Sequence, residues 1–191
     1  MRKVVVVGVG ALGSHFIQFM RNVDCKLVAI DYDRVEKKNV LSQFHSKASV
    51  GKNKTQGLQQ TLSFLYGVRV DAVPHKLTGD NSRQLLSGSS LVVDCLDNAP
   101  SRQVVRDLVR KESLPCLHGA LAPGGDYGSV IWDDKFRIDG AGEGQATCED
   151  GEHLPFIVLV ASMLARVAQD FLKDGRQDSY QLFSRSPAIR I

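Results

Sequence analysis

The chain has 191 residues, a length that suits one domain with a hydrophobic core of ordinary size. Hydrophobic residues make up 43% and charged residues 24%, which is typical of an ordinary globular protein. The formal net charge of +3 comes from 24 basic and 21 acidic residues, and no Lys/Arg tract or basic helix stands out. Nucleic acid is therefore not an expected partner, and we expect a single domain over residues 1–191.

The four cysteines, Cys25, Cys95, Cys116 and Cys148, are widely spaced and contain no CxxC pair. A zinc site is therefore not expected. Cys25 and Cys95 lie in or beside apolar runs, where free thiols are commonly buried, and this favours a reduced, cytoplasmic protein. The chain begins with strand-like residues, without a cleavage signal. Because no apolar run reaches the roughly 18 residues of a membrane helix, we expect no membrane segment.

Strand-like and helix-like segments alternate through most of the chain. In chain order we expect strands at residues 4–8, 26–30, 68–73, 91–95 and 116–121, and helices at residues 11–22, 54–66, 81–86 and 101–111. The strand at residues 4–8 is continuously apolar and β-branched, as in parallel sheets buried on both faces. This alternation predicts an α/β fold: a Rossmann-like, doubly wound, mostly parallel sheet with helices on both faces.

The pattern changes after Pro123. Residues 128–132 and 135–139 look like two antiparallel strands joined at Asp133 and Asp134. A strongly apolar helix is expected at residues 154–172, and core is its favoured location over an interface. The last nineteen residues are polar, and we expect at most one short strand there. The fold therefore includes a short antiparallel C-terminal extension.

A glycine-rich turn, Gly8-Val9-Gly10-Ala11-Leu12-Gly13, joins the first strand to the first helix. Gly8 permits the tight turn, Gly10 lets a phosphate approach the backbone, and Gly13 lets helix and strand pack closely. The helix N-terminus offers free N–H groups and a positive dipole end to an anion. The alternative is a purely structural turn, but the strand before and the helix after it favour nucleotide binding.

Acidic and basic side chains follow the later strands. Asp31 ends the second strand, where it can accept the ribose hydroxyls of NAD or ATP, or simply cap the next turn. Lys54 opens a helix, where it can reach a triphosphate or remain a solvated lysine. Asp94 and Asp97 fall at the carboxyl end of a central strand, and a carboxylate beside a triphosphate suits Mg²⁺. Asp97 is alternatively a helix N-cap.

Four patterns taken together, GxGxxG at residues 8–13, DxDxVxxxN at 31–39, GxxK at 51–54 and DCxDNxxxR at 94–102, resemble the ubiquitin-activating-enzyme-like superfamily. Its bacterial members include the ThiF/MoeB-type adenylyltransferases. The resemblance covers about residues 3–172. It implies ATP and Mg²⁺ as cofactors and a small ubiquitin-like or sulfur-carrier protein as partner. The implied reaction is attack by the carrier's C-terminal carboxylate on the α-phosphorus of ATP.

The resemblance also assigns roles to individual residues. Asp31 would hold ribose, Asn39 and Lys54 would contact the phosphates, and Asp97 would hold magnesium and orient the nucleotide. The full set of expected nucleotide contacts is Gly8, Gly10, Ala11, Leu12, Gly13, Asp31, Asp33, Asn39, Gln43, Lys54, Asp97 and Asn98. Asn98 and Arg102 are also expected to fix the local turn.

Catalysis in such a site needs charge neutralisation and alignment rather than a strong base. Lys54 and Asp97 are therefore the expected catalytic residues. No histidine is expected in an acid–base pair, and His15, His45 and His118 are predicted to be ordinary polar positions. Many relatives carry a cysteine at a point similar to Cys148, where it can take the activated acyl group as a thioester or join a disulfide-type intermediate, and this resemblance makes Cys148 the third expected catalytic residue.

Cys148 has two competing interpretations. A nearby helix N-terminus favours a covalent role for it, whereas its acidic neighbours Glu149, Asp150 and Glu152 favour an unreactive loop thiol.

One position departs from the family pattern. Relatives have Arg then Gln at the end of an NxxRQ segment, whereas this chain has Ser42 before Gln43. Serine cannot replace the charge or the bidentate fork of arginine. Three interpretations remain open: an active enzyme, which we expect to form a homodimer or a heterodimer with a related subunit; a non-catalytic nucleotide-binding partner subunit; and an NAD(P)-binding oxidoreductase.

Overall fold

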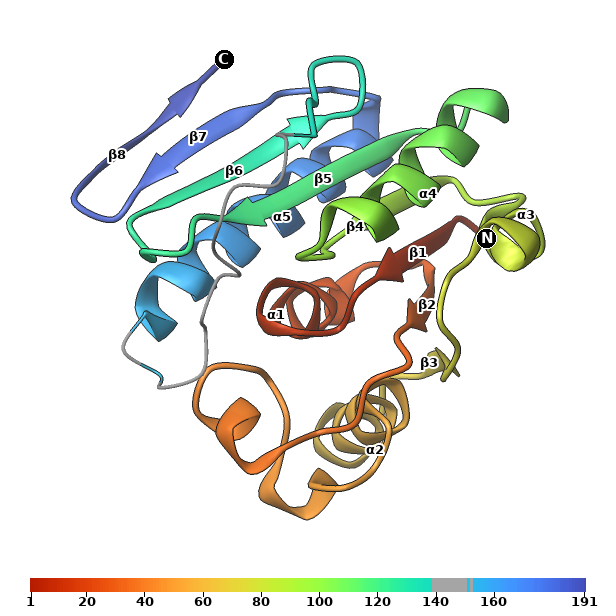
Figure 1. The fold of residues 1–191 in the computed structure, drawn as a ribbon, viewed down its shortest axis with the longest axis vertical. Coiled ribbons are helices and arrows are strands. Elements are labelled where there is room, and N and C mark those ends of the chain that lie inside the picture. The colour runs from red at the N-terminus through yellow and green to blue at the C-terminus, as the bar shows by residue number, and fades with distance from the viewer. Residues whose placement is uncertain (139–150, 152) are drawn as a thin grey trace.

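One sheet of eight strands, in the order β3-β2-β1-β4-β5-β6-β7-β8, runs through the part of the chain that the structure describes (Figure 1). The structure is a computed structural model that describes residues 1–138, 151 and 153–191. The strands are β1 (Lys3–Val7), β2 (Lys26–Ile30), β3 (Val70–Val73), β4 (Leu91–Asp94), β5 (Cys116–Leu121), β6 (Tyr127–Trp132), β7 (Tyr180–Phe183) and β8 (Ser186–Arg190). The α-helices are α1 (Ala11–Phe19), α2 (Lys54–Tyr66), α3 (Gly79–Leu86), α4 (Ala99–Lys111) and α5 (Leu154–Asp174), and the 3₁₀ helices are η1 (Met20–Asn22), η2 (Lys37–Leu41) and η3 (Lys47–Ser49).

The sheet is parallel on one side and antiparallel on the other. The neighbours β3, β2, β1, β4 and β5 are parallel, whereas β6, β7 and β8 continue the sheet in antiparallel pairs. The chain moves from β1 outward through β2 and β3 and then returns to the other side of β1 for β4. The predicted doubly wound fold with an antiparallel extension is confirmed. The order of strands reverses between β1 and β4, and a ligand is expected beyond their carboxyl ends.

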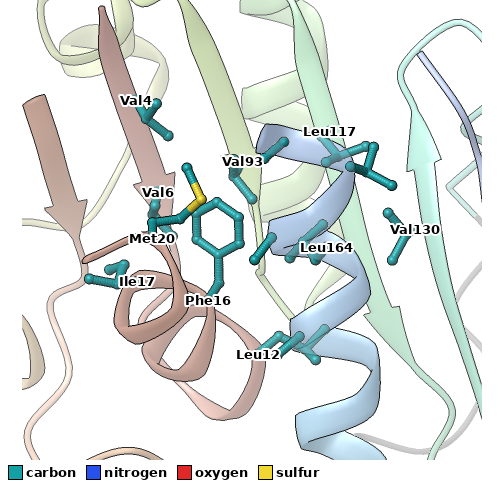
Figure 2. Packing of buried hydrophobic residues seen from close by; sticks show 14 of the residues in the cluster. Val4, Val6, Leu12, Phe16, Ile17, Met20, Val93, Leu117, Val130 and Leu164 are labelled. Carbon is teal, nitrogen blue, oxygen red and sulfur yellow. The ribbon is translucent and has the colours of Figure 1, made fainter. Parts of the chain in front are cut away.

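Helices cover both faces of the sheet, as predicted (Figure 1). Along β1, Val4 and Val6 belong to the core under α1 and α5, whereas Val5 and Val7 belong to the core under α3 and α4. Figure 2 shows the first of these cores, in which Phe16 of α1 packs between the sheet and α5. Since β1 is buried on both faces, its β-branched sequence follows from its central place in the sheet.

By length and composition alone, α5 could cross a membrane, so the expectation that no apolar segment is long enough is wrong. Its contacts are nevertheless those of a core helix. A Cβ on Gly128 of β6 would lie 2.6 Å from Val160, and one on Gly119 of β5 would lie 3.0 Å from Leu164. These glycines let α5 approach the sheet closely, and its buried face fills the core beside α1.

The C-terminal third differs from the prediction in two ways. Residues 135–138 form no strand, because the chain turns after β6 with Phe136 N donating to the Trp132 carbonyl (3.0 Å). The Phe136 ring instead turns inward and stacks on His118 with the ring centroids 3.9 Å apart. The last nineteen residues contain two strands, β7 and β8, rather than at most one. Their alternation of apolar and polar residues is too weak to mark them in the sequence.

Candidate functional site

A polar hollow of about 170 Å³ lies beyond the carboxyl ends of β1, β2 and β4, where the strand order reverses. Among the residues that line it are these predicted nucleotide contacts: Gly8, Gly10, Asp31, Asp33, Lys54, Asp97 and Asn98. The volume is below the ~300 Å³ at the lower end of common ligand pockets, so the hollow can enclose only part of a nucleotide. Residues from all four sequence patterns, or directly beside them, thus meet at one edge of the sheet.

Sequence reasoning missed another part of the wall, formed by Tyr32, His75, Lys76, Leu77, Cys95, Leu96 and Ser101. Residues 75–77 come directly after β3, so the rule that ligands gather beyond strand carboxyl ends would have found them. The Lys76 ammonium lies 5.5 Å from the centroid of the Tyr32 ring, a cation–π distance. This pair lies at the rim of the hollow, because Tyr32 is exposed.

The glycine turn has two structural glycines and one open glycine. Gly8 has φ +87°, and a Cβ there would lie 2.8 Å from the Cys95 carbonyl oxygen. A Cβ on Gly13 would lie 1.9 Å from the Gly8 carbonyl oxygen. Among the described residues, no atom lies within 4 Å of a Cβ position on Gly10, and none supplies a side-chain cap to the N-terminus of α1, which follows it. The free space and the free N–H groups therefore coincide at Gly10, where an anion can approach.

Asp31 connects the glycine turn to the loop after β2. Its carboxylate accepts hydrogen bonds from Val9 N (2.7 Å) and Asp33 N (2.8 Å). Burial raises the pKa of Asp31, although the nearby Lys54 charge and the two backbone N–H groups favour the ionised form. The Lys54 ammonium is 3.3 Å from Asp33 rather than paired directly with Asp31. Asp31 therefore directs an incompletely neutralised carboxylate at the hollow, which suits hydroxyl donors such as those of ribose.

Asn53, which the sequence analysis did not single out, positions the acidic loop against α2. Its amide nitrogen donates to the carbonyls of Asp31 (3.0 Å) and Asp33 (3.1 Å). Its side-chain oxygen accepts from Thr55 N (2.9 Å), which caps α2. The same residue thus fixes Asp31, Asp33 and the start of the helix that carries Lys54. Its position just before a predicted helix is a recognisable N-cap signal.

Asp97 lies in the loop between β4 and α4 and is exposed at the edge of the hollow. Asn98 caps α4 by accepting from Ser101 N (3.0 Å), which is the turn role expected for it. Arg102 donates to the Leu96 carbonyl and to the Gly119 carbonyl (2.7 Å), and so fixes the same loop as predicted.

The carboxylates at the hollow limit the kind of metal site that it can form. Within the described residues no group of three or more His, Cys, Asp or Glu side chains could hold a metal ion. A single carboxylate such as Asp97 fits Mg²⁺ that is held mainly by substrate phosphates.

Other predicted contacts lie away from the hollow. Ala11, Leu12 and Gly13 begin α1, and the Leu12 side chain is in the core (Figure 2). Asn39 is buried, and its side-chain oxygen accepts from Glu36 N (2.9 Å) to cap η2. Gln43 has a buried side-chain oxygen without a hydrogen-bond partner among the described residues. Nucleotide contact by these residues stays a prediction.

Ser42 and two histidines form a buried layer behind the glycine turn. His15 Nε2 donates to the Ser42 carbonyl (3.1 Å), and His45 Nε2 donates to the Val9 carbonyl (3.0 Å). Burial lowers the pKa of His45 to about 4 and also lowers that of His15, so both are neutral at physiological pH. These histidines have a structural role rather than being ordinary polar positions, because each fixes a loop carbonyl by a hydrogen bond, that of Ser42 or that of Val9.

His118 corrects the expectation that no histidine is in an acid–base pair. Its Nδ1 donates to Asp94 (2.8 Å) and its Nε2 to Asp133 (3.2 Å). Burial opposes its charged form, but hydrogen bonds to Asp133 and Asp94 raise the pKa of His118 above its ordinary value. The signal was hidden because Asp133 directly follows β6, and the antiparallel pairing of β5 with β6 brings it beside His118.

Cys25, Cys95 and Cys116, which lie in the part of the chain that the structure describes, are free thiols. Burial raises the pKa of Cys25 to about 11 and also raises the pKa values of Cys95 and Cys116 above their ordinary range. Cys95 lines the hollow, but its thiol is a poor nucleophile. Cys148, the predicted acyl acceptor, lies outside the described residues.

Known proteins resemble this chain in sequence and in fold. A SAMP-activating enzyme E1 from Haloferax volcanii is 36% identical over 125 residues, which are 62% of this chain and 45% of that protein. A sulfur carrier protein adenylyltransferase from Thermus thermophilus is 36% identical over 121 residues, with the same coverage of 62% and 45%. The matched regions thus span about half the length of these curated relatives.

Among solved structures, E. coli MccB in a crystal structure with AMPCPP and MccA has a TM-score of 0.79 at 16% identity, covering 100% of this chain and 63% of that one. At that identity the likeness shows the fold alone. A model of the ThiF family matches residues 1–172. Since this match takes in all four sequence patterns and the strands β1 to β6, the chain belongs to the ThiF family.

Proposed function

We propose that the protein is an adenylyltransferase that uses ATP to activate the C-terminal carboxylate of a small ubiquitin-like or sulfur-carrier protein. The single observation that carries this proposal is the hollow at the reversal of strand order. There the glycine turn, Asp31, Lys54 and Asp97 line one cavity. The names of the relatives support the reaction class: one is called a sulfur carrier protein adenylyltransferase. These relatives also make ATP a better candidate than NAD(P).

The chemistry joins two anions, because a carboxylate must approach the α-phosphorus while pyrophosphate leaves. Such a reaction is accelerated by positive charge and by alignment more than by a base. In this proposal the open amides around Gly10 hold phosphate oxygens and Asp31 accepts the ribose hydroxyls. Lys54, already held at the rim by Asp33, supplies a point charge to the phosphates.

Asp97 is the residue that would hold Mg²⁺ together with the phosphates of ATP. When bound, the ion supplies positive charge that neutralises the triphosphate and the leaving pyrophosphate. The surrounding chain supplies position: Asn98 and Arg102 fix the loop that carries Asp97. A later transfer of the activated acyl group to Cys148 would form a thioester and release AMP; Cys95, which lines the hollow, is unsuited to that role because burial raises the pKa of its thiol.

A second candidate function is a nucleotide-binding subunit that lacks catalysis alone. Ser42 favours it, because the residue is buried with its carbonyl held by His15 and offers no cation to the hollow. Such a chain would need the missing charge from a related subunit or from a second copy in a homodimer. Adding the related subunit would then create activity that neither chain has alone.

An ATP–pyrophosphate exchange assay with candidate carrier proteins tests the proposal. We expect exchange that depends on both the carrier and Mg²⁺, and we expect Asp97→Ala to reduce it at least ~100-fold, as loss of a main electrostatic group does. Asp134→Ala is the matched control, because it removes an exposed aspartate away from the hollow. ATP binding without exchange for every carrier would favour the subunit, and preferential binding of NADH would reject both proposals.

A further inference from the structure

His118 lies in a network of charged side chains on the α4 side of the sheet. Its neighbours come from every element packed against it: Asp94 on β4, Asp133 after β6, Arg102 on α4 and Cys116 on β5. The Asp133 carboxylate also accepts from Arg110 Nε (2.7 Å). Two carboxylates are therefore shared among one histidine and two arginines, with Phe136 stacked on the imidazole.

The two hydrogen bonds of His118 require a proton on each ring nitrogen. Asp94 and Asp133 are both held ionised, because Arg102 and His118 keep the pKa of Asp94 below its usual range despite burial, and His118 and Arg110 do so for Asp133. Carboxylates only accept hydrogen bonds, and a neutral imidazole has a single N–H to donate. Loss of the Nε2 proton would therefore break the hydrogen bond to Asp133 and leave that nitrogen with only the weak S–H donor of Cys116, whose sulfur is 3.5 Å away.

This network contacts the loop that carries Asp97. One oxygen of Asp94 accepts from His118, and the other accepts from Leu96 N (2.9 Å). Arg102, 3.6 Å from Asp94, donates to the Leu96 carbonyl. Leu96 is thus held at both its N–H and its carbonyl, and it lines the hollow directly before Asp97.

We propose that His118 is a positioning residue for the nucleotide site: as an imidazolium between Asp94 and Asp133, it holds the Asp97 loop in the geometry that receives the nucleotide. The role in nucleotide binding rests on the proposed function, whereas the coupling between His118 and the loop does not. His118 touches neither the hollow nor Asp97, so its action is transmitted through Asp94 and Leu96.

The coupling is measured by NMR on the free protein between about pH 5.5 and pH 9. We expect the His118 ring to titrate with a midpoint above that of an ordinary histidine, and the amide signals of Leu96 and Asp97 to shift with the same midpoint. A ring that is already neutral at about pH 6, or loop amides that ignore its titration, would overturn the proposal.

Asp133→Asn distinguishes positioning by the proton from simple packing. Because Oδ1 of Asp133 faces His118 and Oδ2 faces Arg110, an asparagine can turn its NH₂ to a neutral His118 and its oxygen to Arg110. This variant keeps both contacts without needing the proton. Asp134→Asn, the neighbouring exposed position, makes the same charge change without facing His118.

The functional consequence is measured as the dissociation constant for Mg·ATP at about pH 6.5 and pH 9. For the wild type and Asp134→Asn we expect affinity to weaken by about threefold or more at the higher pH, as for coupling through a packed network. Asp133→Asn should change by less than about twofold over the same range, since in this variant a neutral His118 keeps its contacts to position 133 and to Asp94. Equal pH dependence in all three proteins would contradict the proposal. Absence of ATP binding at every pH would reject the proposed function instead, and the NMR titration would still decide the coupling.

Discussion

Asp31 and Asp94 occupy similar positions and have opposite electrostatic surroundings. Each lies at the carboxyl end of a strand next to β1, and each accepts a hydrogen bond from a loop N–H. Asp94 is fully buried, whereas Asp31 is partly exposed at the hollow. Asp94 has both Arg102 and His118 as partners, which lower its pKa despite burial. Asp31 has no such direct partner among the described residues, and burial raises its pKa. A fully paired carboxylate fixes the fold, whereas an incompletely paired one at a hollow is suited to a ligand.

The largest effect is expected from Asp94→Asn, which removes the charge that compensates Arg102 and His118. Breaking one partner out of a buried ionic network costs about 3–5 kcal/mol of unfolding free energy. Urea denaturation measures this loss. The control is Asp71→Asn, which removes an aspartate from an exposed pair with Lys26 (2.9 Å) and should cost less than ~1 kcal/mol. Similar losses in the two variants would show that the buried network contributes no more than a surface pair.

Asp31→Asn should have a small effect on stability and a large effect on the affinity for ATP. We expect the unfolding free energy to change by only ~1 kcal/mol, because asparagine keeps one of the two backbone hydrogen bonds. The affinity for ATP should fall by at least ~10-fold, since a charged acceptor for ribose hydroxyls is lost. Calorimetric titration of the variant with ATP measures the second quantity. If Asp31→Asn instead unfolds as readily as Asp94→Asn, the distinction between the two carboxylates fails.

The residues around Asp31 that line the hollow were predictable from local sequence patterns. A β-branched run, a glycine-spaced turn and an acid after the next strand each have a local physical cause. The carboxyl ends of parallel strands meet at one edge, which gathers Gly10, Asp31 and Asp97 without further information. The same rule covers His75 and Lys76 after β3, so their omission was a failure to apply it to every strand.

The network around Asp94 was not predictable, because it depends on contacts between residues far apart in the chain. His118 meets Asp133 only through the antiparallel pairing of β5 with β6 and the turn that follows. That turn also places Phe136 on the imidazole, where the sequence had suggested a strand. For Asn39 the sequence predicted a phosphate contact, which stays a prediction, but it did not indicate the local cap of η2 that its side-chain oxygen makes with Glu36 N.

Acid titration gives the smallest and most discriminating difference between the two carboxylates. The pKa of Asp94 is lowered on folding, so its contribution to stability is present above the unfolded pKa and is lost as pH falls through the folded pKa. The pKa of Asp31 is raised on folding, so its effect has the opposite sign: protonation favours the folded state as pH falls, and this gain disappears as pH rises through the folded pKa. Urea denaturation between about pH 3 and pH 7 should therefore show the destabilisation by Asp94→Asn shrinking towards acid pH. Over the same range the destabilisation by Asp31→Asn should grow by less than ~1 kcal/mol, because the variant lacks a proton-binding carboxylate that the wild type uses. Parallel pH profiles for the two variants would mean that the two carboxylates have the same electrostatic surroundings after all.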